Sequence, residues 1–165
     1  MDIKAEWSVI RKHFNQSFSS SFHVSIASID SKEMPTVTPI GSFFLDRIDQ
    51  KGIYFEKFPT KLPRNAGINR NICVLGVNSH KLFWVRSLFN GKFHSPPAIK
   101  LYGKLGERRE ANEKEIALLQ KRMRFTKGLK GHKYLWDEMN VIREINFHNA
   151  ESINLGAMTY QLKGQ

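Results

Sequence analysis

The sequence predicts a mainly β fold of the α+β class, a small β-barrel of about six or seven mostly antiparallel strands with peripheral helices. Two observations predict it. Short segments rich in β-branched and aromatic residues recur along the chain, separated by turn residues. Most gaps between them are too short for a crossover helix, so we expect antiparallel pairing. The 165 residues show no shift in composition, and we expect one domain, 1–165.

The chain opens with a predicted helix, a loop and a strand. Residues Lys4–Phe14 carry apolar side chains at helical spacing, which predicts a short amphipathic helix. The polar, serine-rich segment Asn15–Ser21 is expected to form a loop. In Phe22–Ile29 the residues alternate between two faces and β-branched residues are frequent, as in a strand.

The next predicted strand is irregular. Residues Thr36–Arg47 form a strand pattern, but Pro39 and Gly41 interrupt it. Proline and glycine inside a strand mark a bulge or a close approach of the backbone to another group. The irregularity indicates either a bend of a barrel or a place where something flat lies against the main chain, and the two interpretations are compatible.

A strand followed by a basic segment is the unit around which we expect the rest of the chain to be organised. The apolar, aromatic strand Gly52–Phe58 breaks at Pro59, and a short helix is predicted at about Pro63–Arg70. Lys61 and Arg64 follow the strand end directly, and such cations together with backbone N–H groups can hold a phosphate. The alternative is that the two cations belong to a solvated helix face.

Two further strands, a loop, another strand and a helix follow. Ile72–Asn78 and Lys81–Phe89 are predicted as strands joined by a tight turn, and Phe89–Pro97 is a loop by its glycine and paired prolines. Ala98–Arg108 is a further strand. The strongest helix pattern is Asn112–Met123, with acidic residues in its first turn and basic residues at its end.

The C-terminal part has the weakest local patterns. Phe125–Lys133 is predicted as a flexible basic connector, and Tyr134–Met139 is ambiguous. Val141–Phe147 alternates between two faces and is predicted as a strand. Glu151–Tyr160 is expected to form one more short strand followed by a loop. We expect residues of about 22–109 to form the barrel core and 110–165 to supply a C-terminal helix and strand.

The chain has a formal net charge of +11, and a strongly basic protein is a candidate for nucleic-acid binding. Its Lys and Arg residues are spread along the chain, without a basic tail, zinc-finger spacing or aromatic RNA-binding motif, so no specific nucleic-acid partner is expected. The single cysteine, Cys73, fits a reducing compartment. The absence of a signal peptide or a long apolar run adds the expectation of a cytoplasmic protein with no membrane partner.

Three local patterns occur in order over roughly Phe22–Arg109. The first is the strand pair SIASID and PTVTPIG. The second is the Tyr54–Phe55 strand leading to the pattern RN-x-x-x-N that starts at Arg64, and the third is the strand ICVLGV. Together they resemble the flavin-binding split-barrel family typified by pyridoxamine 5'-phosphate oxidase, and the C-terminal phrase INLGAMT is similar to the ends of some members.

This resemblance implies a split β-barrel that binds FMN at the interface of a homodimer, with each site built from both subunits. It implies phosphate contacts from Lys61, Arg64 and Asn65, although many members have Ser-Arg-Lys where this chain has Thr-Lys-Leu-Pro at 60–63. The implied flavin-ring wall comprises Thr38, Pro39, Ile40, Gly41, Ser42, Glu56, Lys57 and Phe58. The long segment containing Trp84, Arg86 and Phe93 is expected either to reach the neighbour's flavin or to close the dimer.

The function implied is that of an FMN-dependent oxidoreductase. It would pass two electrons between a reduced nicotinamide or a small organic substrate and an acceptor, with FMN supplying the redox chemistry. No catalytic residue can be named, and the six histidines lack metal-ligand spacing. One alternative is the same barrel as a carrier of flavin, deazaflavin or haem without turnover. The other is a basic nucleic-acid-binding barrel.

Overall fold

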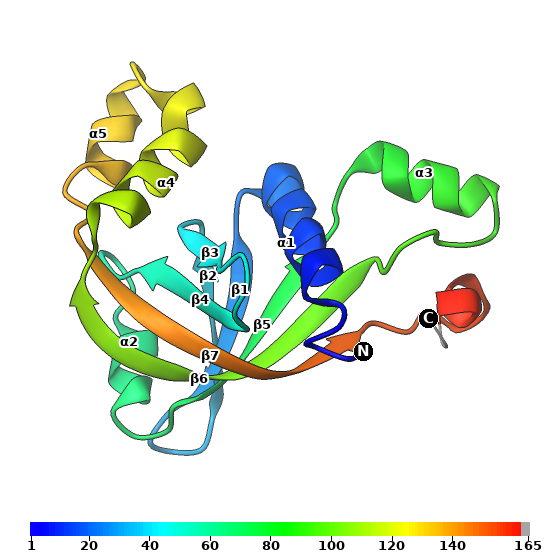
Figure 1. Cartoon of the computed structure of the whole chain (residues 1–165), viewed down its shortest axis with the longest axis horizontal. Helices are drawn as coiled ribbons and strands as arrows, with labels where there is room; N and C mark the ends of the chain where they lie inside the picture. Colours follow the sequence, from blue (N-terminus) through cyan, green and yellow to red (C-terminus); the bar gives the residue numbers. More distant parts are fainter. Residues whose placement is uncertain (163–165) are drawn as a thin grey trace.

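The structure, a computed structural model, describes residues 1–162, and its centre is a seven-stranded antiparallel sheet in the order β2-β1-β5-β6-β7-β4-β3 (Figure 1). The strands are β1 (Val24–Ile29), β2 (Pro35–Ile40), β3 (Phe43–Leu45), β4 (Lys51–Phe55), β5 (Asn71–Val77), β6 (Ala98–Glu110) and β7 (Val141–Ser152). The helices are α1 (Trp7–Ser21), α2 (Lys61–Ala66), α3 (Lys81–Phe89), α4 (Glu113–Met123) and α5 (Lys130–Trp136), with 3-10 segments η1 (Arg124–Thr126) and η2 (Gly156–Leu162). None of these helices is long and apolar enough to cross a membrane.

The sheet is curled, because its two edge strands are consecutive in the chain. Strand β2 at one edge is joined to β3 at the other by only Gly41 and Ser42. Two residues cannot span an open seven-stranded sheet, whose neighbouring strands lie about 4.8 Å apart. The predicted strand at Thr36–Arg47 is therefore two strands separated by the bend that its Pro and Gly residues indicated. The predicted mainly β, split-barrel fold is confirmed.

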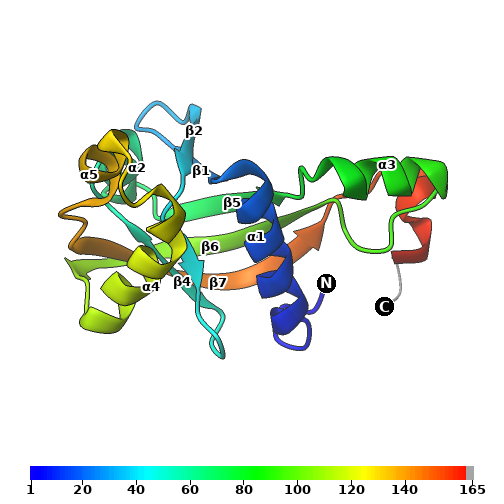
Figure 2. The ribbon, with the colours of Figure 1, turned by 90° about the horizontal axis from the view of Figure 1, so that it is seen from above.

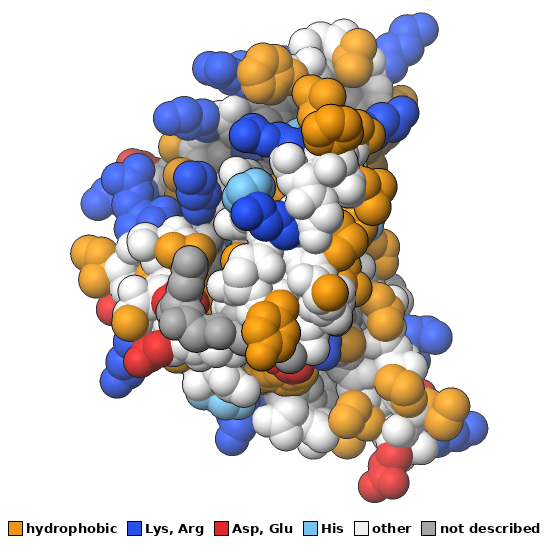
Figure 3. All heavy atoms as spheres, turned by 90° about the vertical axis from the view of Figure 1, so that its right-hand side faces the viewer, with side chains coloured by type: hydrophobic (Ala, Val, Ile, Leu, Met, Phe, Trp, Pro, Cys, Tyr) orange, Lys and Arg blue, Asp and Glu red, His pale blue; other side chains and the backbone are white. Residues whose placement is uncertain are grey.

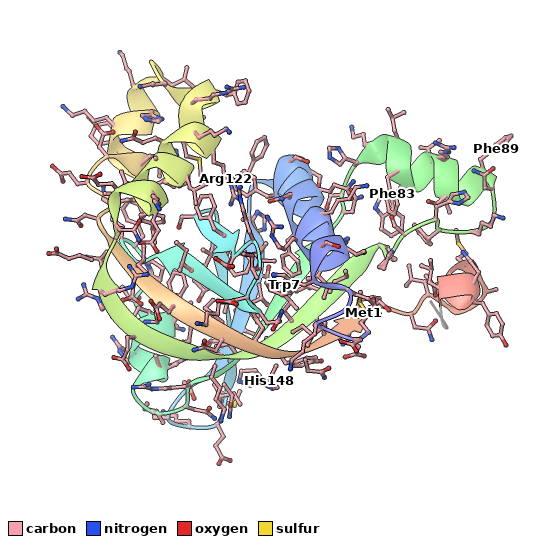
Figure 4. The ribbon with its side chains drawn as sticks, viewed as in Figure 1. Met1, Trp7, Phe83, Phe89, Arg122 and His148 are labelled. Atoms are coloured by element: carbon pink, nitrogen blue, oxygen red, sulfur yellow. The ribbon has the colours of Figure 1, made fainter. Side chains whose placement is uncertain are left out.

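The inner face of the barrel is filled by side chains from the sheet and from two helices. Helix α1 contributes Trp7, Ile10 and Phe14 to the main core, and α2 contributes Leu62 and Ala66. Figure 4 shows Trp7 pointing from α1 toward the sheet. Without these helices the apolar residues on the inner face of the curled sheet would contact water, which is unfavourable.

Helix α1 extends through the segment that the sequence predicted as a loop, so the prediction for Asn15–Ser21 is wrong. The hydroxyls of Ser19, Ser20 and Ser21 each donate to a carbonyl three or four residues earlier. Serine usually favours non-helical conformations because it competes with the backbone for hydrogen bonds. Here the competing bonds are made inside the helix, and the buried Phe14 anchors its middle.

A second core lies on the outer face of β3, β4 and β7, under the α4–α5 hairpin (residues 113–136). It contains Phe44, Phe55, Leu119, Met123, Met139 and Ile142. Asn112 and Glu115 form a capping box that starts α4 at the predicted place. Residues 125–133 were predicted to form a flexible connector. They instead contain the end of η1, a turn and the first four residues of α5, whose Trp136 packs against this second core.

Arg122 of α4 joins the hairpin to α1. Its guanidinium lies 3.7 Å from the ring centroid of Phe44 and 4.4 Å from that of Phe18, and it also donates to the Phe43 carbonyl. Figure 4 shows Arg122 between α4 and α1. Burial lowers the pKa of Arg122 to about 10, so its guanidinium stays charged at neutral pH, and the aromatic faces stabilise that charge.

Strand β7 differs from the prediction in length and place. It continues from Val141 to Ser152 and lies between β6 and β4, so the C-terminal part supplies a central strand of the barrel. The prediction of a separate short strand in Glu151–Tyr160 is wrong, because Glu151 and Ser152 end β7 and the 3-10 segment η2 follows. Gly103 permits the irregular β6–β7 pairing, because a Cβ there would lie 2.7 Å from the Asn146 carbonyl oxygen.

Residues Lys81–Phe89 form helix α3, so the predicted strand there is wrong. Phe83 and Trp84 pack around Phe93 of the following loop, with ring centroids 5.4 and 5.2 Å apart. In Figures 1 and 2 this arm extends from the barrel at the end opposite the α4–α5 hairpin. Figure 4 shows Phe83 directed inward and Phe89 directed away from the protein at the tip of the arm.

Candidate cofactor site

A pocket of about 280 Å³ lies at the bend between β2 and β3. The end of β2 and the bend form one wall, the end of β4 and the residues after it form a second, and α5 with the segment after it forms the third. Its lining residues are Thr38, Pro39, Ile40, Gly41, Ser42, Phe55, Phe58, Pro59, Leu135, Trp136 and Met139. The five residues that the resemblance implied as a flavin wall at 38–42 are thus brought together around one cavity.

Hydrogen bonds to β4 hold the bend in place. The Ser42 hydroxyl donates to the Phe55 carbonyl at 3.3 Å, and the Phe55 N–H donates back to the Ser42 carbonyl at 3.4 Å. Gly41 is required by a close approach, because a Cβ there would lie 3.1 Å from the Phe22 carbonyl oxygen and 3.2 Å from the Trp136 indole. Both interpretations of the irregular strand therefore apply, and the flat group against the main chain is Trp136 of the same chain.

Of the two residues that follow Glu56, Phe58 lines the pocket and Lys57 does not. Phe58 is half-exposed and lines the pocket. The Lys57 ammonium lies 5.3 Å from the Phe58 ring centroid and donates to the carbonyls of Tyr134 and Asp137. Lys57 therefore ties the end of α5 to the end of β4, and this contact holds the third wall of the pocket in place.

Glu56 turns away from the pocket into a buried ion-pair network. Its side chain is 4% exposed, and its carboxylate accepts from Arg143 Nε at 2.8 Å and Arg108 Nε at 3.0 Å. The Tyr54 hydroxyl also donates to it at 2.8 Å. Burial, followed by this bond to Glu56, raises the pKa of Tyr54 far above its usual range. Glu56 does not line the pocket. Its bonds to Arg108 and Arg143 instead join the end of β4 to β6 and β7.

The predicted phosphate residues on α2 divide into two kinds. Lys61 and Arg64 are exposed, and no ion pair within residues 1–162 involves either of them. Helix α2 begins two residues after Pro59 of the pocket. Asn65 is buried, and its amide donates to Ser28 Oγ at 2.9 Å and Thr36 Oγ1 at 3.0 Å. These bonds hold α2 on the β1–β2 hairpin, and a phosphate contact from Asn65 stays a prediction.

Trp84, Arg86 and Phe93 lie on the α3 arm and are not brought to this pocket within one chain. The Trp84 indole N–H donates to the Asn78 carbonyl at 2.7 Å, and Phe93 is fully buried. Exposed Arg86 borders a separate pocket on the arm, which His94 also lines. None of the three lines the pocket at the β2–β3 bend, and a contact of this segment with a neighbour's flavin or with a dimer partner stays a prediction.

Sequence reasoning missed the third wall of the pocket. Leu135, Trp136 and Met139 fall in the segment whose secondary structure was ambiguous, more than ninety positions after the bend that they face. The aromatic residue itself was visible in the sequence. No local pattern places Trp136 beside Gly41, because that contact depends on how the hairpin packs on the outer face of β4.

No family model matches the chain, and no curated protein matches it either. Solved structures do resemble it. An FMN-binding protein from Syntrophomonas wolfei has a TM-score of 0.58 at 10% identity, over 93% of this chain and 96% of that one. A Listeria innocua protein provisionally classed as a pyridoxamine 5'-phosphate oxidase has a TM-score of 0.54 at 10% identity, over 88% and 98%. The haem storage protein HutZ from Vibrio cholerae has a TM-score of 0.53 at 12% identity, over 92% and 95%.

These identities are low enough that the similarity extends to the fold and no further. The matches cover most of both chains, so the similarity is one of the whole fold and not of a single motif. The chain has the split-barrel fold found in FMN-binding, pyridoxamine 5'-phosphate oxidase-like proteins and in a haem storage protein.

Proposed function

We propose that the protein binds FMN at the β2–β3 bend and acts as an FMN-dependent oxidoreductase on a small-molecule substrate. The observation that carries the proposal is the pocket itself. The family resemblance implied a flavin wall at five consecutive residues, 38–42, and all five line one cavity in a split-barrel fold. Solved structures with this fold include an FMN-binding protein, which supports the choice of cofactor.

The residues around the pocket fit a flat, partly apolar ring system. Phe58, Trp136 and Met139 supply apolar surface against which such a ring would lie. Lys61 and Arg64 are cations without an ion-pair partner among residues 1–162, and they would take the phosphate. Bound FMN would supply the two-electron chemistry, and the protein would hold and shield it.

We further propose a homodimer in which the second copy completes the site. The pocket volume of about 280 Å³ is at the lower end for a ligand of this size, so part of FMN would extend beyond it. Val37, Ala27 and Cys73 lie side by side on neighbouring strands β2, β1 and β5. They are on the outer face of the sheet, because α1 and α2 pack their buried side chains on the opposite face. Pro39, which lines the pocket, lies on this outer face next to Val37, so a copy docked there would border the cofactor.

The site assignment is tested by titrating FMN into the protein and following the quenching of flavin fluorescence. Lys61→Ala/Arg64→Ala is expected to weaken FMN binding at least tenfold, because charge-assisted bonds to a phosphate are strong. Lys32→Ala/Lys104→Ala removes the same charge from exposed positions elsewhere and is the matched control. Equal affinities for the two double variants would contradict the phosphate role.

Catalysis is tested separately from binding. An oxidoreductase is expected to show loss of the flavin absorption band when NADH or NADPH is added without oxygen. FMN that binds but is not reduced by either nicotinamide would exclude a nicotinamide donor, and FMN that no organic substrate reduces either would leave the protein as a flavin carrier. The single cysteine suits the reducing cytoplasm, where we place the protein.

Haem is a second candidate ligand, favoured by the environment of His132. This residue lines a pocket between α4 and α5 together with the apolar residues Met123 and Trp136. Thr126 Oγ1 donates to the Met123 carbonyl, so at 2.8 Å it accepts from His132 Nδ1. With a proton on Nδ1, the imidazole presents Nε2 as the nitrogen that would ligate iron. An intense haem absorption band that His132→Ala abolishes would favour haem over FMN.

A further inference from the structure

The tip of the α4–α5 hairpin concentrates positive charge. Between residues 116 and 136 the sequence contains no Asp or Glu. The five exposed cations of this segment are Lys121, Arg124, Lys127, Lys130 and Lys133. None of them belongs to an ion pair in the part of the chain that the structure describes, which ends at residue 162. The sixth cation, Arg122, is half-buried between aromatic rings and anchors the hairpin instead.

Large apolar side chains are exposed among these cations. Phe125 is 82% exposed, Leu129 63% and Tyr134 77%. At the top of Figure 3, which only the hairpin reaches, Lys and Arg side chains flank exposed hydrophobic ones, with no acidic side chain among them. Water contact with Phe125 and Leu129 is unfavourable, so a partner that covers both would gain free energy from their burial.

The tip has a defined conformation. The bond between Thr126 and His132 joins η1 to α5, and the Leu129 N–H donates to the Thr126 carbonyl. Gly128 makes the turn with a φ of +95°, which a residue with a side chain rarely adopts. Phe125 and Leu129 are therefore held on either side of a tight turn at the end of the hairpin.

We infer that the cationic tip (Lys121, Arg124, Phe125, Lys127, Leu129, Lys130, Lys133 and Tyr134) docks on the surface of an anionic lipid bilayer. The cations would face lipid headgroups, and the apolar residues would enter the boundary between headgroups and acyl chains. The sequence alone had led us to expect no membrane partner. That expectation considered only segments that span a bilayer, and a surface contact needs no such segment.

Two other occupants fit the tip less well. A second copy placed across a two-fold axis would set the same five cations against each other, because both partners of such an interface present the same surface. Nucleic acid would satisfy the cations, but its interfaces are more polar than this one. Phe125 and Tyr134 could stack on bases, whereas the aliphatic Leu129 would gain little from stacking.

Sedimentation of the full-length protein with lipid vesicles tests the inference. Vesicles of phosphatidylcholine mixed with phosphatidylserine are expected to carry the protein down at about 0.15 M salt, and vesicles of phosphatidylcholine alone are not. Each cation near an anionic surface contributes roughly fivefold in affinity, so Lys127→Ala/Lys130→Ala/Lys133→Ala should weaken binding about a hundredfold. Equal binding to both kinds of vesicle would overturn the inference.

The matched control removes the same charge from other exposed positions. Lys32→Ala/Lys92→Ala/Lys104→Ala is expected to bind anionic vesicles within about threefold of the unchanged protein, since nonspecific attraction by net charge is weak at this salt concentration. If both triple variants lose binding equally, the effect is one of net charge and the tip has no special role. Far-UV circular dichroism of each variant confirms that it is folded.

The apolar part of the tip separates lipid from nucleic acid. Phe125→Ser/Leu129→Ser is expected to reduce vesicle binding at least tenfold without changing the charge. Ile48→Ser/Ile68→Ser, at exposed apolar positions elsewhere, should have no such effect. Single-stranded RNA that binds more tightly than the vesicles and is unaffected by Phe125→Ser/Leu129→Ser would overturn the inference in favour of nucleic acid. A change of the protein from dimer to monomer in the lysine variant would overturn it in favour of a second copy.

Discussion

Substitution of Glu56 by Gln removes the single negative charge from the buried network that joins β4, β6 and β7. The amide group would place N–H donors against the guanidinium of Arg143, whose side chain is only 13% exposed. Breaking a buried ion pair on one side costs about 3–5 kcal/mol. Arg143 keeps its bond to the Gly106 carbonyl, and Gln keeps one carbonyl oxygen, so we take the lower end, about 3 kcal/mol.

Thermal unfolding of the apoprotein, followed by circular dichroism, measures this cost. For a chain of this length 1 kcal/mol lowers the Tm by roughly 2–4 °C, so Glu56→Gln should lower it by about 6–12 °C. The matched control is Glu107→Gln. That side chain is 79% exposed and lies 3.5 Å from Arg70, so its change should cost less than about 1 kcal/mol. An unchanged Tm for Glu56→Gln, combined with lost FMN binding, would refute the structural role and return Glu56 to the cofactor wall.

Three other perturbations test the fold and the site. Burial lowers the pKa of His13 below its unfolded value of about 6.5, and a hydrogen bond to the Gly76 carbonyl opposes this only in part. The native state therefore binds fewer protons than the unfolded state, and stability is lost as the pH falls below about 6.5. In urea titrations His13→Gln should therefore lose less stability between about pH 7 and pH 5 than the unchanged protein, and equal losses would refute this. Gly103→Ala should destabilise the protein by about 1–3 kcal/mol in the same assay, because the new Cβ would meet backbone atoms. Its control, Gly131→Ala, lies in open space within α5 and should be neutral or stabilising. The reverse order of stabilities would contradict the β6–β7 pairing. In a variant that keeps Trp136 as its only tryptophan, FMN should quench the indole fluorescence, and constant emission at saturating FMN would place the cofactor elsewhere.

The sequence was sufficient wherever structure depends on local pattern. The alternation in Phe22–Ile29 predicted β1, and the acidic first turn after Asn112 predicted α4 with the correct start. The proline and glycine in Thr36–Arg47 correctly indicated the bend at which the sheet curls. Each of these features is carried by residues that are neighbours in the chain, so no knowledge of the fold was needed.

The sequence was insufficient where a distant partner decides the outcome. Lys81–Phe89 contains a continuous apolar run that suits a buried strand or a helix equally, and packing on Phe93 selects the helix. The serine-rich end of α1 stays helical because the helix is anchored on the sheet. Trp136 reaches the β2–β3 bend only after the whole hairpin has packed on the second core, and no local pattern reports such an arrangement.

The cofactor proposal depends on one property, the ability of the folded chain to retain FMN. The most direct test is the absorption spectrum of the full-length protein after incubation with FMN and removal of the unbound flavin by gel filtration. Flavin bands that travel with the protein at about one FMN per chain are the predicted result. A protein that leaves the column colourless, while its circular dichroism shows it to be folded, would contradict FMN binding at the β2–β3 bend.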